Sequence, residues 1–432
     1  MKVLHLNTYT YNKSLSFPHY QFHKILLKNG HESFIISAKG DVKENEIIYL
    51  NEKRVFPYFD ISRFVRKLYF EKYKKNRNNY FFPEWNLDFV TTKQILKKIK
   101  IKPDIIMVYW TKFAFNQKII YELSTFFSIP VICVMVDMAP MTGGCHYAFD
   151  CERYFERCGK CPALNSNKDD DLSRKTWEFK KKYLDMTDLT VLAASDILSK
   201  QVSKSSLLCD KKIEKFLNSV NEQIFVPQDK FLIRDKMNLP CDRKIVFFGA
   251  ASIKEKRKGF SYFKKALEIL YKNLEKDKLK DNIFLLIVGN NFDKCKLPFE
   301  YKYYSYLRTE ADLSKMYQAC DLFVCPSIED SGPLMINQSI LSGRPVVSFD
   351  MGVARDLVYN GKTGYIAELK NSSDLAFGIQ SILSMSEIEW NCYSMNCRKL
   401  GMEKCSTSSQ NERLESLLNQ VIKNFKDKRY SK

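Results

Sequence analysis

The chain has 432 residues with a formal net charge of +19, and 45% of its residues are hydrophobic. This length fits two domains of roughly 100 to 200 residues, and the hydrophobic share excludes intrinsic disorder as the default. No run of roughly 18 apolar residues occurs, so the sequence predicts no membrane-spanning helix.

Three features of the sequence bear on the cellular compartment and on the kind of binding partner. The opening MKVLHLNTYT becomes polar too early for a signal peptide. Thirteen cysteines scattered along such a chain favour a reducing compartment over a disulfide framework. The positive charge favours phosphate-bearing partners, either nucleic acid or an anionic membrane surface, and lysines on solvated faces account for part of the excess.

The first half of the chain alternates between strand-like and helix-like patterns. Residues 2–6 and 32–37 read as strands around a helix at 19–28, which is a βαβ opening. Further strands are predicted at 103–110, 131–136 and 189–193, with a helix at 195–203. The run at 131–136 is continuously apolar, which is typical of a parallel strand buried on both faces.

A basic and aromatic segment interrupts this pattern at residues 61–79, ISRFVRKLYFEKYKKNRNN. A basic helix with aromatic side chains on its other face is typical of a membrane-surface element. The alternative is an ordinary helix with a solvated basic face.

A candidate site follows the strand at 131–136, since loops at the carboxyl ends of parallel strands hold ligands. Asp137 and His146 are the candidate reaction-centre residues there. Either side chain could instead hold the loop by hydrogen bonds.

The same loop continues into a cysteine cluster formed by Cys145, Cys151, Cys158 and Cys161. The last pair is a two-residue knuckle, and four thiolates in a short span suit a tetrahedral zinc ion. The alternatives are free thiols packed as small apolar groups, or His146 in place of one cysteine. A four-ligand zinc would be structural, because no coordination position stays open for chemistry.

A second α/β domain is predicted to begin after a boundary near 215–240. Its first strand, 244–248, is followed by a glycine and a basic loop, in which Gly249, Arg257 and Lys258 form a candidate phosphate site. A strand at 284–288 and a helix at 309–317 come next. The predicted domains are 1–215, joined by a C-terminal helix at about 405–432, and 216–404.

The stretch 326–343, PSIEDSGPLMINQSILSG, lies between strands at 322–325 and 345–349. Pro333 near the start and Gly343 after the end are typical helix boundaries. The helix N-terminus would offer unpaired N–H groups and partial positive charge to an anion. Asp330 and Gln338 stand eight residues apart, so both can face one cleft.

This stretch resembles the donor-binding signature of glycosyltransferase family 4. The pattern of two carboxylates separated by seven residues, then Gly-x-Pro-Val-Val, falls here on Asp330, on Gln338 in place of glutamate, and on 343–347. The resemblance implies the α/β GT-B fold: two Rossmann-like domains around a cleft, with a C-terminal helix that crosses back to the first domain. It also implies transfer of a sugar from a nucleotide-sugar donor with retention at the anomeric carbon.

The resemblance assigns roles to the candidate residues. Asp330 would bind hydroxyls of the donor sugar, and Gln338 would bind ribose hydroxyls. The donor diphosphate, from a UDP- or GDP-sugar, would be bound by the remaining residues of the second domain: Gly249, Arg257, Lys258, Gly332, Leu334 and Met335. No catalytic metal is expected.

Several positions depart from the family pattern. The family's paired glycines are missing from 10–18, its histidine is Val136 and its arginine is Ala250. A degenerate or partner-dependent GT-B protein is therefore one alternative, and a GT-B sugar-nucleotide epimerase is another. A zinc-containing nucleic-acid-binding protein is a third, and nucleic acid is the less favoured partner.

The resemblance thus implies a hexosyltransferase of polysaccharide biosynthesis. Its acceptor would be a glycan or a polyprenyl-linked glycan. The expected location is cytoplasmic, peripheral on an anionic inner membrane face.

Overall fold

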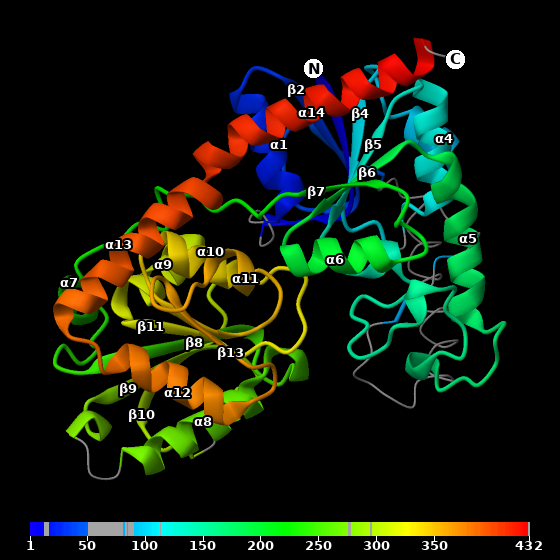
Figure 1. Ribbon diagram of the computed structural model, residues 1–432. Coiled ribbons are helices and arrows are strands. Elements are labelled where there is room, and N and C mark those ends of the chain that lie inside the picture. The colour runs from blue at the N-terminus through cyan, green and yellow to red at the C-terminus, as the bar shows by residue number, and fades with distance from the viewer. Residues whose placement is uncertain are drawn as a thin grey trace. The chain divides into compact units, whose positions relative to one another are not determined.

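The computed structural model describes residues 1–12, 17–50, 81–82, 84, 90–112, 114–274, 278–293 and 296–430. The basic segment predicted at 61–79 lies outside these residues. The chain divides into two compact units (Figure 1). The first comprises Met1–Ala194, Leu198–Phe216 and Asn411–Lys432, and the second comprises Ser195–Ile197 and Leu217–Gln410.

The first unit is built on a parallel sheet of seven strands in the order β3-β2-β1-β4-β5-β6-β7. The strands are β1 (Lys2–Thr10), β2 (Glu32–Gly40), β3 (Ile47–Tyr49), β4 (Ile105–Val108), β5 (Val131–Met135), β6 (Leu189–Ala193) and β7 (Lys212–Lys215). The helices are α1 (Pro18–Lys28), α3 (Thr92–Leu96), α4 (Gln117–Phe127), α5 (Leu172–Met186), α6 (Asp196–Lys204) and α14 (Thr407–Tyr430).

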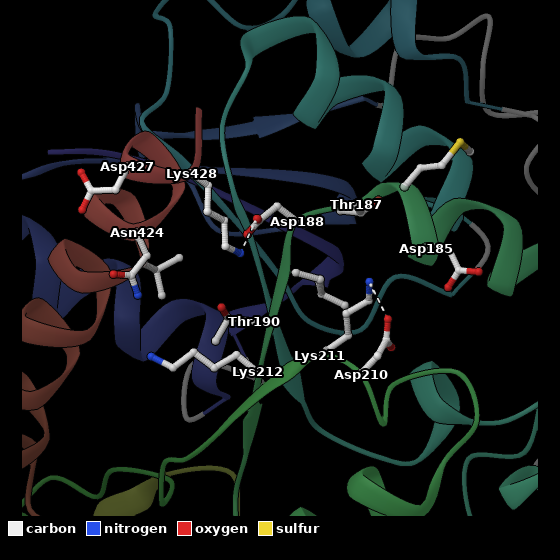
Figure 2. Close-up of a pocket in the computed structure, with 13 residues that line it drawn as sticks. Asp185, Thr187, Asp188, Thr190, Asp210, Lys211, Lys212, Asn424, Asp427 and Lys428 are labelled. Atoms are coloured by element: carbon white, nitrogen blue, oxygen red, sulfur yellow. Dashed lines mark hydrogen bonds and ion pairs between the residues drawn. The ribbon is translucent and has the colours of Figure 1, made fainter. Parts of the chain in front are cut away.

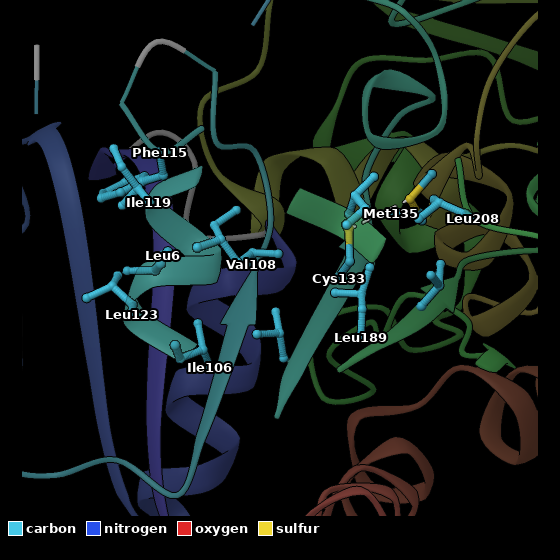
Figure 3. Close-up of a cluster of buried hydrophobic side chains, with 14 of the residues drawn as sticks. Leu6, Ile106, Val108, Phe115, Ile119, Leu123, Cys133, Met135, Leu189 and Leu208 are labelled. Atoms are coloured by element: carbon cyan, nitrogen blue, oxygen red, sulfur yellow. Dashed lines mark hydrogen bonds between the residues drawn. The ribbon is translucent and has the colours of Figure 1, made fainter. Parts of the chain in front are cut away.

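Helices cover both faces of this sheet, because its strands carry apolar side chains on both sides. Ile106 and Val108 of β4 pack with residues of α4, including Ile119 and Leu123 (Figure 3). The alternate residues of β4 pack on the other face with α1 and with α14, which contributes Leu414, Leu417, Leu418 and Val421. Every residue of β5 and β6 is buried, as predicted for central parallel strands.

The second unit repeats the plan with six parallel strands in the order β10-β9-β8-β11-β12-β13. The strands are β8 (Lys244–Ser252), β9 (Ile283–Asn290), β10 (Glu300–Tyr304), β11 (Leu322–Cys325), β12 (Val346–Phe349) and β13 (Gly364–Ala367). The helices are α7 (Lys230–Lys236), α8 (Phe260–Asn273), α9 (Glu310–Ala319), α10 (Leu334–Leu341), α11 (Ala354–Leu357), α12 (Ser372–Leu383) and α13 (Glu387–Lys404).

Both sheets have their first strand at the centre, with later strands added outward on each side, which is the doubly wound Rossmann order. In the second unit α8 and α12 pack on one face, and α9, α10 and α13 pack on the other. The predicted α/β fold with two Rossmann-like domains is therefore confirmed. No helix in the described part of the chain is long and apolar enough to cross a bilayer.

Candidate functional site

Two loops meet at the carboxyl edge of the second sheet, one after β8 and one after β11. The backbone N–H of Ile328 donates to the carbonyl of Arg257 at 2.8 Å, which joins them. Gly259 has a φ of +72°, and a Cβ there would lie 1.7 Å from the carbonyl oxygen of Pro326. Only glycine therefore allows the basic loop to approach the β11 loop this closely.

A compact charged cluster forms where these loops meet. Oδ2 of Asp330 lies 2.7 Å from Nη1 of Arg257 and 2.5 Å from Nζ of Lys258. The Asp330 side chain is only 11% exposed. Burial alone would raise the pKa of this carboxyl, but Lys258 and then Arg257 outweigh it and lower the pKa to about 2. The carboxylate is thus ionised at neutral pH and holds two cations side by side.

Helix α10 begins directly beside this cluster. Pro333 is its N-cap, and the N–H of Gly332 approaches Oδ1 of Asp330 at 3.4 Å. The N–H groups of Leu334 and Met335 belong to the first turn, where no intrahelical acceptor exists, so this end suits an anion. Met335 also packs over Gly249, where a Cβ would lie 2.4 Å from its Cε atom. The structure therefore brings the predicted phosphate-binding residues of both loops together.

Gln338 is buried one turn further along α10, with 3% of its surface exposed. Its Oε1 lies 3.2 Å from the hydroxyl of Tyr317, a fully buried residue of α9 that sequence reasoning had not assigned to the site. The Tyr317 hydroxyl is also 3.1 Å from the carbonyl of Met335. Tyr317 thus connects α9 to the predicted ribose-binding position, a relation that no local sequence pattern could reveal.

The candidate residues of the first unit form a close pair after β5. Nδ1 of His146 lies 2.5 Å from Oδ2 of Asp137, and Oδ1 of Asp137 accepts the N–H of Ala139 at 2.8 Å. The imidazole packs edge-on against the rings of Phe82 and Trp110. Asp137 therefore has an imidazole partner although Val136 stands at the position of the family's histidine.

Lys180 of α5 is a buried cation beside this loop that sequence reasoning missed. Its Nζ donates to the carbonyls of Ala139 at 2.7 Å and Thr142 at 3.1 Å. It also pairs with Oε1 of Glu84 at 3.3 Å. The sequence offered no signal for this role, because Lys180 lies in an otherwise ordinary amphipathic helix.

The four cysteines of the predicted cluster are free and line one small cavity, together with Phe81 and Tyr154. Among the residues that the structure describes, no three His, Cys, Asp or Glu side chains are grouped as ligands of one metal ion would be. The prediction of a zinc site is therefore not confirmed.

A larger hollow of about 880 Å³ lies elsewhere in the first unit (Figure 2). It is lined by residues at the start of β6 and β7, such as Asp188 and Lys212, and by Asp427 and Lys428 of α14. Lys428 pairs with Asp188 at 2.9 Å. This hollow lies at the amino ends of the strands and contains none of the predicted site residues, so we do not assign the ligand site to it.

The residues of the charged cluster lie in a region that matches a known sequence family. Residues 229–395 match the family described as Glycosyl transferases group 1. This match falls within the second unit. The matched region includes Asp330, Arg257, Lys258 and the start of α10.

Two curated relatives agree with this assignment. An uncharacterised glycosyltransferase of Methanocaldococcus jannaschii is 23% identical over 239 residues, which is 52% of this chain and 57% of the relative. An N,N′-diacetylbacillosaminyl-diphospho-undecaprenol α-1,3-N-acetylgalactosaminyltransferase of Campylobacter jejuni is 26% identical over 122 residues, 28% of this chain and 31% of the relative. The matches thus span little more than half of the first relative and about a third of the second.

Solved structures resemble the whole chain. Sucrose-phosphate synthase of Thermosynechococcus elongatus has a TM-score of 0.65 at 14% identity, with 98% of this chain and 100% of that chain covered. Anabaena HepE, solved with UDP and glucose, has a TM-score of 0.60 at 12% identity, with 97% and 100% covered. At these identities the likeness establishes the fold, and the predicted GT-B class is confirmed.

Proposed function

We propose that this protein transfers a sugar from a UDP- or GDP-sugar to a glycan or polyprenyl-linked glycan in polysaccharide biosynthesis, with retention at the anomeric carbon. The observation that carries the proposal is the contact of Arg257 and Lys258 with Asp330 inside the matched region. The UDP complex of HepE supports a nucleotide-sugar donor. The Campylobacter relative, named for an undecaprenol-linked acceptor, supports the acceptor class.

In this proposal the two cations neutralise the diphosphate as it leaves the sugar. Charge-assisted hydrogen bonds from Arg257 and Lys258, together with the N–H groups of Leu334 and Met335, stabilise the developing negative charge. Asp330 holds the cations together before the donor arrives, because two adjacent positive charges repel each other without a counter-ion. Its Oδ2 contacts the cations, and its Oδ1 lies 3.4 Å from the backbone nitrogen of Gly332, so Oδ1 can accept a hydrogen bond from a hydroxyl of the donor sugar.

The ribose is assigned to Gln338. The Tyr317 hydroxyl orients the amide by donating to Oε1, which leaves the Nε2 group to donate to a ribose oxygen. An uncharged amide binds hydroxyls more weakly than a carboxylate does, so we expect modest donor affinity.

The acceptor hydroxyl is assigned to the Asp137–His146 pair of the first unit. When Asp137 accepts the proton of Nδ1, the neutral imidazole has its lone pair on Nε2. This nitrogen can accept a hydrogen bond from the attacking hydroxyl and orient it. The net charge of +19 supports a location on an anionic membrane surface, where lipid-linked acceptors are found.

The test is release of nucleoside diphosphate from a panel of UDP- and GDP-sugars, with and without a lipid-linked glycan extract. We expect release from one donor, an increase on adding the extract, and loss of release in Asp330→Ala. A degenerate GT-B protein would bind the nucleotide-sugar but would produce no free nucleoside diphosphate under any condition. An epimerase would convert the sugar of the donor and would also produce no free nucleoside diphosphate.

A further inference from the structure

We propose that three aromatic side chains at the carboxyl edge of the first sheet, Tyr9, Tyr11 and Trp110, bind a sugar ring of the acceptor glycan. We call these three residues the aromatic strip. The inference deepens the proposed transfer reaction and rests on it for the role of His146. It adds a surface that binds the acceptor, which the Asp137–His146 pair alone does not provide.

The strip and the imidazole belong to three adjacent strands. Tyr9 lies near the end of β1, Trp110 follows β4, and His146 lies in the loop after β5. Strand β1 pairs with β4, and β4 pairs with β5. The side chains therefore lie at one edge of the sheet, and this is the edge at which parallel α/β sheets bind their ligands.

The rings form a continuous series that ends at the imidazole. The ring centroids of Tyr11 and Tyr9 are 5.9 Å apart with an angle of 21° between the planes, and Tyr9 lies 5.4 Å from Trp110. The indole of Trp110 is 6.3 Å from the imidazole of His146. These are separations of aromatic rings in contact. All three rings of the strip are half-buried, so each packs on the protein and keeps part of its surface exposed.

The backbone of β1 fixes Trp110 against Tyr9. The carbonyl of Trp110 accepts the N–H of Thr8 at 2.8 Å, and its own N–H donates to Oδ1 of Asn7 at 3.0 Å. The Nδ2 group of Asn7 donates in turn to the carbonyl of Tyr9 at 2.5 Å. The two rings are thus ordered before a ligand arrives, which lowers the entropy cost of binding.

A second contact orders the surroundings of the imidazole. The N–H of Phe82 donates to the carbonyl of Gly144 at 2.7 Å, and the Phe82 ring lies 5.2 Å from that of His146. The ammonium group of Lys112 lies over the Phe82 ring and 5.5 Å from the centroid of Trp110. Since a cation attracts the faces of both rings, Lys112 holds together the two rings that contact the imidazole.

The chemistry of this surface fits a sugar ring better than a purely apolar chain. A pyranose has C–H groups on its faces and hydroxyls around its rim, so it needs apolar contact and hydrogen-bonding groups side by side. The strip offers the flat apolar area of its rings, and its two tyrosines also carry hydroxyls that donate and accept hydrogen bonds. A polyprenyl chain has no group that these hydroxyls or the imidazole could bind.

The order of the residues gives the strip a role in the choice of acceptor hydroxyl. Nδ1 of His146 is bonded to Asp137, so Nε2 is the nitrogen that accepts a hydrogen bond from the acceptor. A sugar ring that packs on Trp110 has its rim within reach of the neighbouring imidazole. The way in which the ring lies on the strip would therefore determine which hydroxyl meets His146, and with it the linkage that is formed.

The first test measures binding without turnover. Oligosaccharides freed by mild acid from a lipid-linked glycan extract are mixed with the full chain, and saturation-transfer difference NMR detects the sugar protons that contact it. We expect signals from the C–H protons of a sugar ring with the wild type and with Trp110→Phe, which keeps a ring. Trp110→Ala should lose most of them. The control Phe126→Ala, which removes a ring of α4 that is 65% exposed, should bind like the wild type.

The second test is kinetic. Tyr11→Ala and Trp110→Ala should each raise the KM for the lipid-linked acceptor by about 2- to 10-fold, which is the effect expected for loss of one aromatic contact. Phe126→Ala should leave this KM unchanged. Tyr11→Ala removes only the outermost ring of the strip, so it tests the proposal in both experiments even if Trp110→Ala does not fold.

Four results would overturn the proposal. The wild type does not bind the freed oligosaccharides, the alanine variants bind them as well as the wild type, or only the intact lipid-linked form binds, which would indicate contact with the polyprenyl chain. The fourth is weaker binding of UDP or GDP in Trp110→Ala, because the rings would then contact the nucleobase. If the oligosaccharides bind through Trp110 but no donor yields free nucleoside diphosphate, the transfer reaction is refuted and the glycan site stands.

Discussion

The Nζ atom of Lys258 lies 2.5 Å from Oδ2 of Asp330, which is 72 residues further along the chain. Arg257 reaches the same oxygen at 2.7 Å. Each partner stands in a loop at the carboxyl end of a parallel strand, and Gly259 allows these loops to touch. Nucleotide binding and the pH dependence of stability in the second unit are both expected to depend on this contact between one carboxylate and two cations.

Replacing Lys258 with alanine should weaken nucleoside diphosphate binding by about 10- to 100-fold, because a hydrogen bond to a charged group contributes about 1.5 to 3 kcal/mol. Isothermal titration calorimetry measures the change. The control is Lys254→Ala, in the same loop, whose side chain is 60% exposed and pairs with Asp293. Equal losses in both variants would mean that charge in general, and not the Asp330 cluster, binds the nucleotide.

The carboxylate of Asp330 should make stability depend on pH. Its pKa is lowered from 3.8 to about 2 in the folded protein. The stabilisation is therefore fully present above about pH 4 and is lost as the pH falls toward 2. The pKa difference corresponds to about 2 kcal/mol at pH 7. Urea unfolding of Asp330→Asn should show a deficit of this size at pH 7 that shrinks to about half at pH 3.

Asp293→Asn is the control for that experiment, since its carboxylate is 79% exposed. It should unfold like the wild type at both pH values. A deficit in Asp330→Asn that stays constant from pH 7 to pH 3 would contradict an ionic origin.

Gly259→Ala should destabilise the second unit and abolish nucleotide binding, because the new Cβ meets the Pro326 carbonyl. The matched control is Gly361→Ala, which has a similar φ of +79° but no atom within 4 Å of the new Cβ. The control bears only the backbone strain of a positive φ, about 1 kcal/mol. Thermal unfolding of both variants separates strain from collision, and equal midpoints would refute the close approach.

His146→Gln should lower the rate of transfer by about 10²- to 10⁴-fold if the imidazole assists the acceptor hydroxyl. Donor affinity should not change, because the donor contacts are assigned to the second unit. His31→Gln, at a histidine that pairs with Glu415 in the first unit, is the control. A parallel loss of donor affinity in His146→Gln would argue for a structural role.

Local signals in the sequence were sufficient for much of the fold. The runs at 189–193 and 322–325 are strands with the predicted bounds. Pro333 and Gly343 correctly predicted the ends of α10, which spans Leu334–Leu341. These elements were predictable because burial on both faces leaves a continuous apolar run, and because Pro and Gly act on the backbone locally.

Other elements carry no such signal. Strand β7, KIEK, lies at the sheet edge with side chains of mixed polarity, and β3 is only three residues long. Their pairing with neighbouring strands, and not their composition, makes them strands. Sequence reasoning therefore missed them.

The candidate site, like the fold, was predictable from the sequence only in part. The types of residue at Arg257, Lys258 and Asp330 indicated anion and sugar binding, but their mutual contacts depend on the fold. The Asp137–His146 pair and the Tyr317–Gln338 contact join positions whose proximity follows from packing. Lys180 is a buried cation that only tertiary structure places beside the loop at 139–142.

The most direct test of the central claim is thermal unfolding of the purified protein with a panel of nucleoside diphosphates. One-site binding predicts about 2.7 kcal/mol of added stability at a hundredfold excess over the dissociation constant. The account predicts a shift with UDP or GDP, and a shift reduced to about 0.4 to 1.4 kcal/mol in Lys258→Ala at the same concentration, because its affinity is 10- to 100-fold weaker. If no nucleoside diphosphate raises the unfolding midpoint of the wild type, the cluster at Asp330 is not a donor site.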